Sequence, residues 1–166
     1  MLKNRHPRDA ESIRISAMAS DEQTSRIHAA IARRAYEIYK SRGSSARNEV
    51  EDWRTAEREL LCKLCFGRTT FGQKVWIGTD ASRFCEGTIG IWVSPRQLTV
   101  FGKPQARNGF ASPEGKGSSE LETIFRIIPL TDEIDAATAR ARIRGTALEI
   151  TATQVRQDEA RGLKAA

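Results

Sequence analysis

The stretch from Thr88 to Lys103, TIGIWVSPRQLTVFGK, constrains the fold more than any other part of the chain. Apolar side chains occupy every second position on both sides of a Pro95-Arg96 pair: Ile89, Ile91, Val93, Leu98 and Val100. This period of two is typical of half-buried strands, and a proline between two such runs favours a tight turn. The stretch therefore predicts a β-hairpin whose second strand ends at Gly102.

Residues 25–61 follow a helical period instead. Apolar side chains recur there at steps of three and four, which places them on one helix face: Ile27, Ile31, Ala35 and Ile38, then Val50, Trp53, Ala56 and Leu60. Gly43 suits a C-terminal cap, and the acidic residues after Asn48 suit the positive end of a second helix. We therefore expect a helical hairpin over residues 25–61, whose apolar face includes Ile31, Ile38, Trp53 and Leu60.

The chain after Cys65 returns to the period of strands. Alternation is visible in KVWIGTDA, FRIIPL, ATARARIR and the run from Leu148 to Ala152. In FRIIPL, Phe125 and Ile127 lie opposite Arg126 and Ile128, and we assign Ile128 to the outer face. Six or seven short strands with one polar face each predict a mainly β fold, an antiparallel β-sandwich over residues 63–153 preceded by the helical hairpin.

The remaining segments carry few large apolar side chains. Residues 1–24 are charged and small, so they bury too little apolar surface to offset their ordering entropy, and we expect a disordered polar arm. Residues 104–120 are rich in Gly, Pro and Ser, which is typical of a mobile loop. Residues 154–166 are expected to form a flexible tail.

Composition limits the classes of partner. The chain has 27 Lys and Arg against 21 Asp and Glu, a net charge of +6 that is spread along the sequence. No basic block stands alone, so nucleic-acid binding is not favoured, and Arg140, Arg142 and Arg144 are interpreted as one solvated strand face. No apolar run approaches the roughly 20 residues that a membrane span needs. The N-terminus lacks the apolar core of a signal peptide, so we expect a cytoplasmic protein.

Cys62 and Cys65 form a CKLC motif with three interpretations. A zinc site needs four ligands, and only Cys85 and two distant histidines remain to complete it. A redox pair would need a thioredoxin-like βαβ context. We favour buried small residues at a junction between helix and strand, and expect no metal and no cofactor.

The sequence offers no arrangement of catalytic side chains. No serine, histidine and acid are set out for nucleophilic catalysis, and His28 falls inside the first predicted helix. Asp132, Glu133 and Asp135 are interpreted as a solvated turn between strands rather than as paired catalytic carboxylates. No glycine-rich phosphate cradle follows a strand and opens a helix. We therefore expect a protein that is not an enzyme.

Two parts of the chain resemble known families. IARRAYEIYKSRG and VEDWRTAEREL, over about residues 26–61, resemble a short bacterial module named domain of unknown function 2934. Residues 63–153 resemble the small heat shock protein family, whose shared α-crystallin domain is an immunoglobulin-like β-sandwich. IGIWVSPRQLTVFGK, FRIIPLTDEID and ATARARIRGTALEIT carry this resemblance in the family's order. The family's C-terminal I-x-I/V anchor, which docks on a neighbouring subunit, is absent from QVRQDEARGLKAA.

The second resemblance implies an ATP-independent chaperone that holds exposed apolar segments of unfolding proteins on apolar grooves and unpaired sheet edges. Candidate contact residues are apolar side chains that alternation turns outward, namely Trp76, Trp92, Phe101 and Ile128. The alternative is that the apolar face of the helical hairpin packs on this patch and buries it. A rival function is that of a protein-interaction adaptor without holdase activity, which the missing anchor and the polar arm favour. The expected partners are unfolding client proteins or one protein partner, with a homodimer left open.

Overall fold

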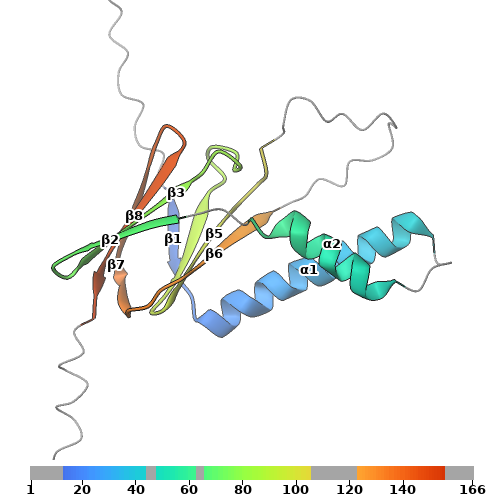
Figure 1. Cartoon of the computed structure of the whole chain (residues 1–166), viewed down its shortest axis with the longest axis horizontal. Helices are drawn as coiled ribbons and strands as arrows, with labels where there is room; N and C mark the ends of the chain where they lie inside the picture. The colour runs from blue at the N-terminus through green and yellow to red at the C-terminus, as the bar shows by residue number, and fades with distance from the viewer. Residues whose placement is uncertain (1–12, 44–47, 63–65, 106–122, 156–166) are drawn as a thin grey trace, which may run out of the picture.

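The computed structural model describes residues 13–43, 48–62, 66–105 and 123–155. In chain order its elements are β1 (Arg14–Ala17), α1 (Ser20–Arg42), α2 (Glu49–Leu60), β2 (Phe66–Phe71), β3 (Lys74–Asp80), β4 (Gly90–Ser94), β5 (Gln97–Gly102), β6 (Ile124–Pro129), β7 (Ile134–Arg144) and β8 (Ala147–Gln154). The described strands make two sheets, and the two helices lie together beside one of them (Figure 1).

The two sheets form a sandwich. One has the strand order β1-β4-β5-β6 and the other β2-β3-β8-β7. Every pair of neighbouring strands is antiparallel except β1 with β4, which run parallel. One continuous apolar core fills the space between the sheets, with buried side chains from both, among them Ile77, Ile91, Leu98, Leu148 and Ile150. The predicted mainly β sandwich preceded by helices is confirmed.

The β-hairpin predicted around Pro95 is also confirmed. β4 and β5 pair from Gly90 opposite Phe101 to Ser94 opposite Gln97, so the turn between them consists of Pro95 and Arg96. The alternating apolar side chains enter the core between the sheets: Ile91, Val93, Leu98 and Val100. The period of two therefore identifies both the strands and their inner faces in this part of the chain.

The first helix begins earlier than its apolar period predicts. α1 starts at Ser20, with Asp21 and Glu22 in the first turn, where the partial positive charge of the helix end favours carboxylates. It ends at Arg42, and the following cap residue Gly43 has a φ of 78°, in the left-handed region that glycine adopts at little cost. α2 likewise has acidic side chains in its first turn. Both helices have the capping features that the sequence shows.

The structure corrects the prediction of a disordered arm over residues 1–24. Arg14–Ala17 forms β1 along the edge of β4, and the chain is helical from Ser20. Ile13 and Ile15 pack against the core between the sheets. Four residues are too few to show a strand period, and β1 gains its backbone partners only from β4, which is distant in the sequence. The sandwich is consequently not confined to residues 63–153.

The predicted mobile loop and the predicted tail fall mostly on residues 106–122 and 156–166, which lie outside the described residues. The first two residues of the predicted tail are ordered instead: β8 extends to Gln154, and the N–H of Val155 donates to the carbonyl of Glu133 at 2.9 Å. These two residues therefore belong to the sandwich. Within the described part of the chain, no helix has the length and apolar character that crossing a bilayer requires.

Candidate functional site

The outer face of the β4–β5–β6 sheet carries three aromatic rings that meet one another, those of Trp92, Phe101 and Phe125. The strand register brings them together, because Phe101 lies opposite Gly90 of β4 and opposite Phe125 of β6. The centroid of the Trp92 ring lies 4.4 Å from that of Phe101 and 5.9 Å from that of Phe125. We call these three rings the aromatic cluster. Rings at such separations attract one another beyond the effect of the area that they bury.

The two helices lie beside the β4–β5–β6 sheet (Figure 1), and their apolar side chains pack against the aromatic cluster. The buried residues at this contact come from α1, α2 and β6: Ile27, Ile31, Ala56, Leu60 and Phe125. Trp92 and Phe101 are half-buried beside them, and so are Ile38 and Trp53 of the predicted helix face. The structure thus brings the four predicted helix-face residues and two of the four predicted contact residues into one apolar cluster. This cluster is separate from the core between the sheets.

A polar contact lies beside the aromatic cluster, under the first turns of α1. Gln23 is fully buried there, and its side-chain oxygen accepts hydrogen bonds from the Thr99 hydroxyl at 2.7 Å and from the Gln97 amide at 3.1 Å. One turn earlier, the hydroxyl oxygens of Ser20 and Ser94 are 2.8 Å apart. α1 therefore docks on the sheet through hydrogen bonds at its N-terminal end and through apolar side chains farther along.

The structure contradicts the placement of Ile128 on the outer face. Ile128 is fully buried in the core between the sheets, whereas Ile127 is 41% exposed. The sequence alternation assigned Phe125 to the face opposite Ile128. In the structure Phe125, and not Ile128, joins Trp92 and Phe101 on the outer face. The faces of β6 are thus the reverse of those assigned from the sequence.

A buried arginine explains the reversal. Arg126 is 1% exposed and directs its guanidinium between the sheets, where it donates to the Thr79 hydroxyl and, at 2.9 Å, to the carbonyl of Asp80 on β3. Both faces of β6 are otherwise apolar, so the arginine alone distinguishes them in the sequence. Arginine is rarely buried without partners, and the partners come from a strand far away in the chain. No local signal in the sequence could have identified them.

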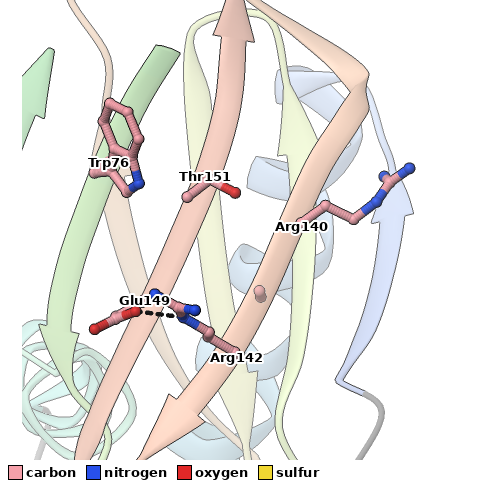
Figure 2. Close-up of a pocket in the computed structure, with 6 residues that line it drawn as sticks. Trp76, Arg140, Arg142, Glu149 and Thr151 are labelled. Carbon is pink, nitrogen blue, oxygen red and sulfur yellow. Dashed lines mark hydrogen bonds and ion pairs between the residues drawn. The ribbon is translucent and has the colours of Figure 1, made fainter. Parts of the chain in front are cut away.

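Trp76 lies on the outer face of the other sheet and is separate from the aromatic cluster. It borders an open hollow of about 260 Å³ together with Arg140, Arg142, Glu149 and Thr151 (Figure 2). Nε of Arg142 donates to Oε2 of Glu149 at 2.5 Å, and Nη1 of Arg140 donates to backbone carbonyls of its own strand. Trp76 thus stands beside the Arg142–Glu149 ion pair, in a hollow whose two arginines and glutamate already have hydrogen-bond partners.

Two of the three cysteines, Cys62 and Cys85, lie within the described residues, and both are free thiols. Cys62 is buried just after α2, and burial raises the pKa of its thiol, against the opposing effect of Arg83 and Arg126. Cys85 is half-buried, and Cys65 lies outside the described residues, so the structure leaves the interpretation of the CKLC motif open. In the ranges that the structure describes, no three His, Cys, Asp or Glu side chains gather in a way that could hold a metal ion.

The residues weighed as catalytic candidates contact other side chains. Asp132 pairs with Arg68, and the Glu133 carboxylate accepts from Arg96 at 3.1 Å. The imidazole of His28 packs on the ring of Trp53, with 4.7 Å between centroids. The two carboxylates therefore tie the β6–β7 turn to β2 and to the β4–β5 turn, and His28 belongs to the contact between the helices.

Comparisons with known proteins match the two parts of the chain separately. The family model described as "Protein of unknown function (DUF2934)" matches residues 28–61. Heat shock protein 16.0 from Schizosaccharomyces pombe is structurally similar over 58% of this chain and 90% of its own, with 13% identity and a TM-score of 0.44. HspA from Xanthomonas axonopodis is similar over 55% of this chain and 92% of its own, with 15% identity and a TM-score of 0.43. No curated protein matches the chain.

Proposed function

We propose that this protein is an ATP-independent molecular chaperone that holds exposed apolar segments of unfolding proteins and prevents their association. The observation that carries the proposal is the aromatic cluster on the outer face of the β4–β5–β6 sheet. Trp92 and Phe101 are only half-buried there, and Ile127 on the same face is 41% exposed. Aromatic and aliphatic side chains gathered outside the core of a sandwich are typical of surfaces that bind other apolar chains.

The edge of the other sheet supports the same proposal. Among the described residues, β2 pairs only with β3, so one side of β2 is left without a neighbouring strand. Phe66 and Phe71, at its two ends, are 39% and 79% exposed. An edge strand with exposed aromatic side chains offers both backbone groups and apolar surface to an extended segment of another protein. Holding a client in this way needs no catalytic residue.

The proposed setting is the cytoplasm, and the proposed partners are unfolding proteins of no single sequence. A homodimer is one way to bring two such surfaces together. Binding by apolar contact and strand addition selects for exposed apolar segments rather than for one partner, which suits a chaperone with many clients.

Light scattering during the heating of a labile client enzyme tests the proposal. The protein should suppress the scattering in proportion to its concentration, and Phe71→Ser and Ile127→Ser should each weaken that suppression. Tyr36→Ser is the matched control, since Tyr36 is 60% exposed but lies on the helical hairpin. Unchanged aggregation of the client at a molar excess of the wild-type protein would contradict the proposal.

A protein-interaction adaptor is the second candidate, and one observation favours it. The helical hairpin has its own hollow of about 320 Å³, lined by Ala35, Tyr36, Tyr39, Glu49, Asp52 and Trp53. Exposed tyrosines around a hollow are typical of sites that recognise one folded partner. An adaptor would leave the scattering of every heated client unchanged, so the same assay separates the two functions.

A further inference from the structure

We propose that β1 and the two helices form a removable cover over the β4–β5–β6 sheet, and that this cover must undock before an unfolding protein can bind there. The inference rests on the proposed holdase function and adds to it the place where clients bind and the step that regulates binding. We call the described residues from Ile13 to Cys62 the N-terminal cover.

The N-terminal cover closes one sheet in two ways. Its helices lie on the outer face, over the aromatic cluster, and β1 pairs with the edge of β4 from Arg14 opposite Gly90 to Ala17 opposite Val93. Only Met18 and Ala19 separate β1 from α1. A displacement of α1 would therefore also pull on β1, so that the face and the edge open together.

The contact between the cover and the sheet is weaker than the sandwich itself. The helices contribute only Ile27, Ile31, Ala56 and Leu60 as buried apolar side chains, whereas the core between the sheets draws on nearly every strand. Ile13, Ile15 and Cys62 of the cover also pack against that core. Part of the contact is the hydrogen-bonded Gln23, and water can replace hydrogen bonds of this kind at small net cost. Contacts between domains or segments of one chain resemble transient protein–protein interfaces. Separating such segments therefore costs less free energy than unfolding the whole protein.

The margin of the cover is already open to solvent. The guanidinium carbon of Arg26 lies 5.8 Å from the centroid of the Trp92 ring, and the Arg26 side chain is 57% exposed and paired with Glu22. The solvated side chain of Arg26 therefore lies over Trp92, at the edge of the aromatic cluster. Such a contact contributes little to holding the cover in place, because surface ion pairs and exposed cation–π contacts are weak.

Undocking would expose a surface that fits an extended apolar segment. The rings of Trp92, Phe101 and Phe125 would lie side by side with Ile127 across three strands, and β4 would lose its parallel neighbour. The free edge would offer backbone hydrogen bonds, and the rings would offer apolar contacts to alternate side chains of the bound segment. The occupant that matches both features is a stretch of unfolded protein rich in apolar residues.

A disulfide across the docked contact tests the proposal. The Ser20 and Ser94 hydroxyl oxygens are 2.8 Å apart, and the Cβ–S bonds of cysteine, longer than the Cβ–O bonds of serine, bring two sulfurs at these positions toward the S–S bond length of roughly 2.05 Å. Ser20→Cys with Ser94→Cys should therefore lock α1 onto β4 when oxidised. The three native cysteines are replaced by alanine in this full-length protein and in its control, which carries Ser20→Cys alone. The client in the scattering assay is one without cysteine.

The expected result is a reversible loss of function. We call the Ser20→Cys, Ser94→Cys variant the lock. When oxidised, the lock should need an about tenfold higher concentration than when reduced to suppress half of the scattering, because its binding-competent state is then populated ten times less. Reduction should restore the suppression. The control should not respond to oxidation. Equal suppression by the oxidised and reduced lock would overturn the cover proposal and leave the holdase function standing.

A measurement without any client separates the two proposals. Hydrogen exchange at the β4 amides should be slower in the oxidised lock than in the reduced protein, and exchange in β3 and β8 should be the same in both. Ile31→Asp, at a residue 4% exposed within the contact, should speed exchange in β4 and raise the binding of an apolar dye. Equal β4 exchange in the two forms of the lock would overturn undocking. If β4 exchange differs between the two forms but neither the wild-type protein nor any variant suppresses scattering, the holdase proposal is contradicted and the undocking proposal stands.

Discussion

Gly90 has no side chain at the point where the ring of Phe101 crosses β4, and this space lets rings from three strands meet on one face. A Cβ built at position 90 would lie 2.4 Å from Cζ of Phe101 and 2.8 Å from Cε2. Neither distance is tolerable between carbon atoms, so the ring or the strand would have to move. A single small residue thus decides whether the aromatic cluster can form.

Gly90→Ala should therefore lower the free energy of unfolding by about 1–3 kcal/mol, the usual cost of an overpacked site, and should weaken docking of the helices. Urea unfolding followed by tryptophan fluorescence measures the loss. Gly78→Ala is the control, because Gly78 is also in a strand and nothing lies within 4 Å of its added Cβ. Equal effects of the two substitutions would contradict the packing argument.

Asp80 provides a second prediction for a single residue. The Ser82 hydroxyl donates to the Asp80 carboxylate at 2.7 Å, and this bond, with that from the Ser82 N–H, lowers the pKa of Asp80. Because the pKa is lower in the folded protein, the bond stabilises the fold above the pKa of the unfolded chain. That stability is lost as the pH falls through the folded pKa.

Ser82→Ala removes the hydroxyl donor but keeps the N–H. We expect the pKa of Asp80 to rise part of the way toward its ordinary value, as followed by NMR titration of the side-chain carboxyl carbon. Ser94→Ala, at a serine that binds elsewhere, should leave the titration of Asp80 unchanged. A titration unaffected by Ser82→Ala would contradict the role of the hydroxyl and leave the Ser82 N–H and the charge of Arg126 as the groups that lower the pKa.

Among the elements, the helical hairpin depends on an ion pair that its periodicity does not reveal. Asp52 is 3% exposed, and its Oδ2 accepts from Nη2 of Arg42 at 2.6 Å, which joins the end of α1 to the start of α2. Arg34 makes a second connection to Glu59 at 2.6 Å, and this bond raises the pKa of Arg34. Both pairs link the two helices, so each contributes to the shape of the hairpin.

Arg42→Ala should destabilise the hairpin by about 1–3 kcal/mol, because it leaves a buried carboxylate without its cation, although solvent at the partly exposed Arg42 moderates the loss. Thermal melting followed by circular dichroism at the helix band measures it. Arg58→Ala is the control, since Arg58 and Glu51 form an exposed pair worth at most about 1 kcal/mol. Melting temperatures that fall equally in both variants would refute a special role for Asp52.

For the whole molecule, β1 decides whether the edge of β4 is open. It covers β4 and, among the described strands, is itself an end strand, as are β6, β2 and β7. Ile15 anchors β1 by packing against the core between the sheets. An uncovered β4 edge would present unpaired backbone groups to a second copy of the chain, and edges of this kind promote association.

Ile15→Asp should detach β1, because it replaces the apolar side chain that packs against the core with a charged one. We expect larger species than in the wild type at equal concentration, measured by light scattering after size-exclusion chromatography. Ile15→Val keeps the strand and serves as the control. If the aspartate variant elutes with the mass of the wild type, β1 does not limit assembly.

Much of this architecture could be predicted from periodicity. The helical steps in residues 25–61 and the alternation around Pro95 and in β7 and β8 identify the elements, because the period of apolar residues reports local backbone geometry and which side is buried. The sandwich class followed from the number and order of such segments. Alternation turned Trp92 and Phe101 outward, and the resemblance to the small heat shock protein family placed them on one face.

Contacts between distant segments depended on the tertiary structure. β1 forms a strand because β4 lies beside it. Arg126 is buried because the Thr79 hydroxyl and the Asp80 carbonyl accept its hydrogen bonds. Burial of Arg126 turns Phe125, rather than Ile128, toward the aromatic cluster. A four-residue strand and a strand apolar on both faces carry no local period that selects a partner. Their free energy comes from groups supplied by other parts of the chain, and only the folded arrangement shows which groups those are.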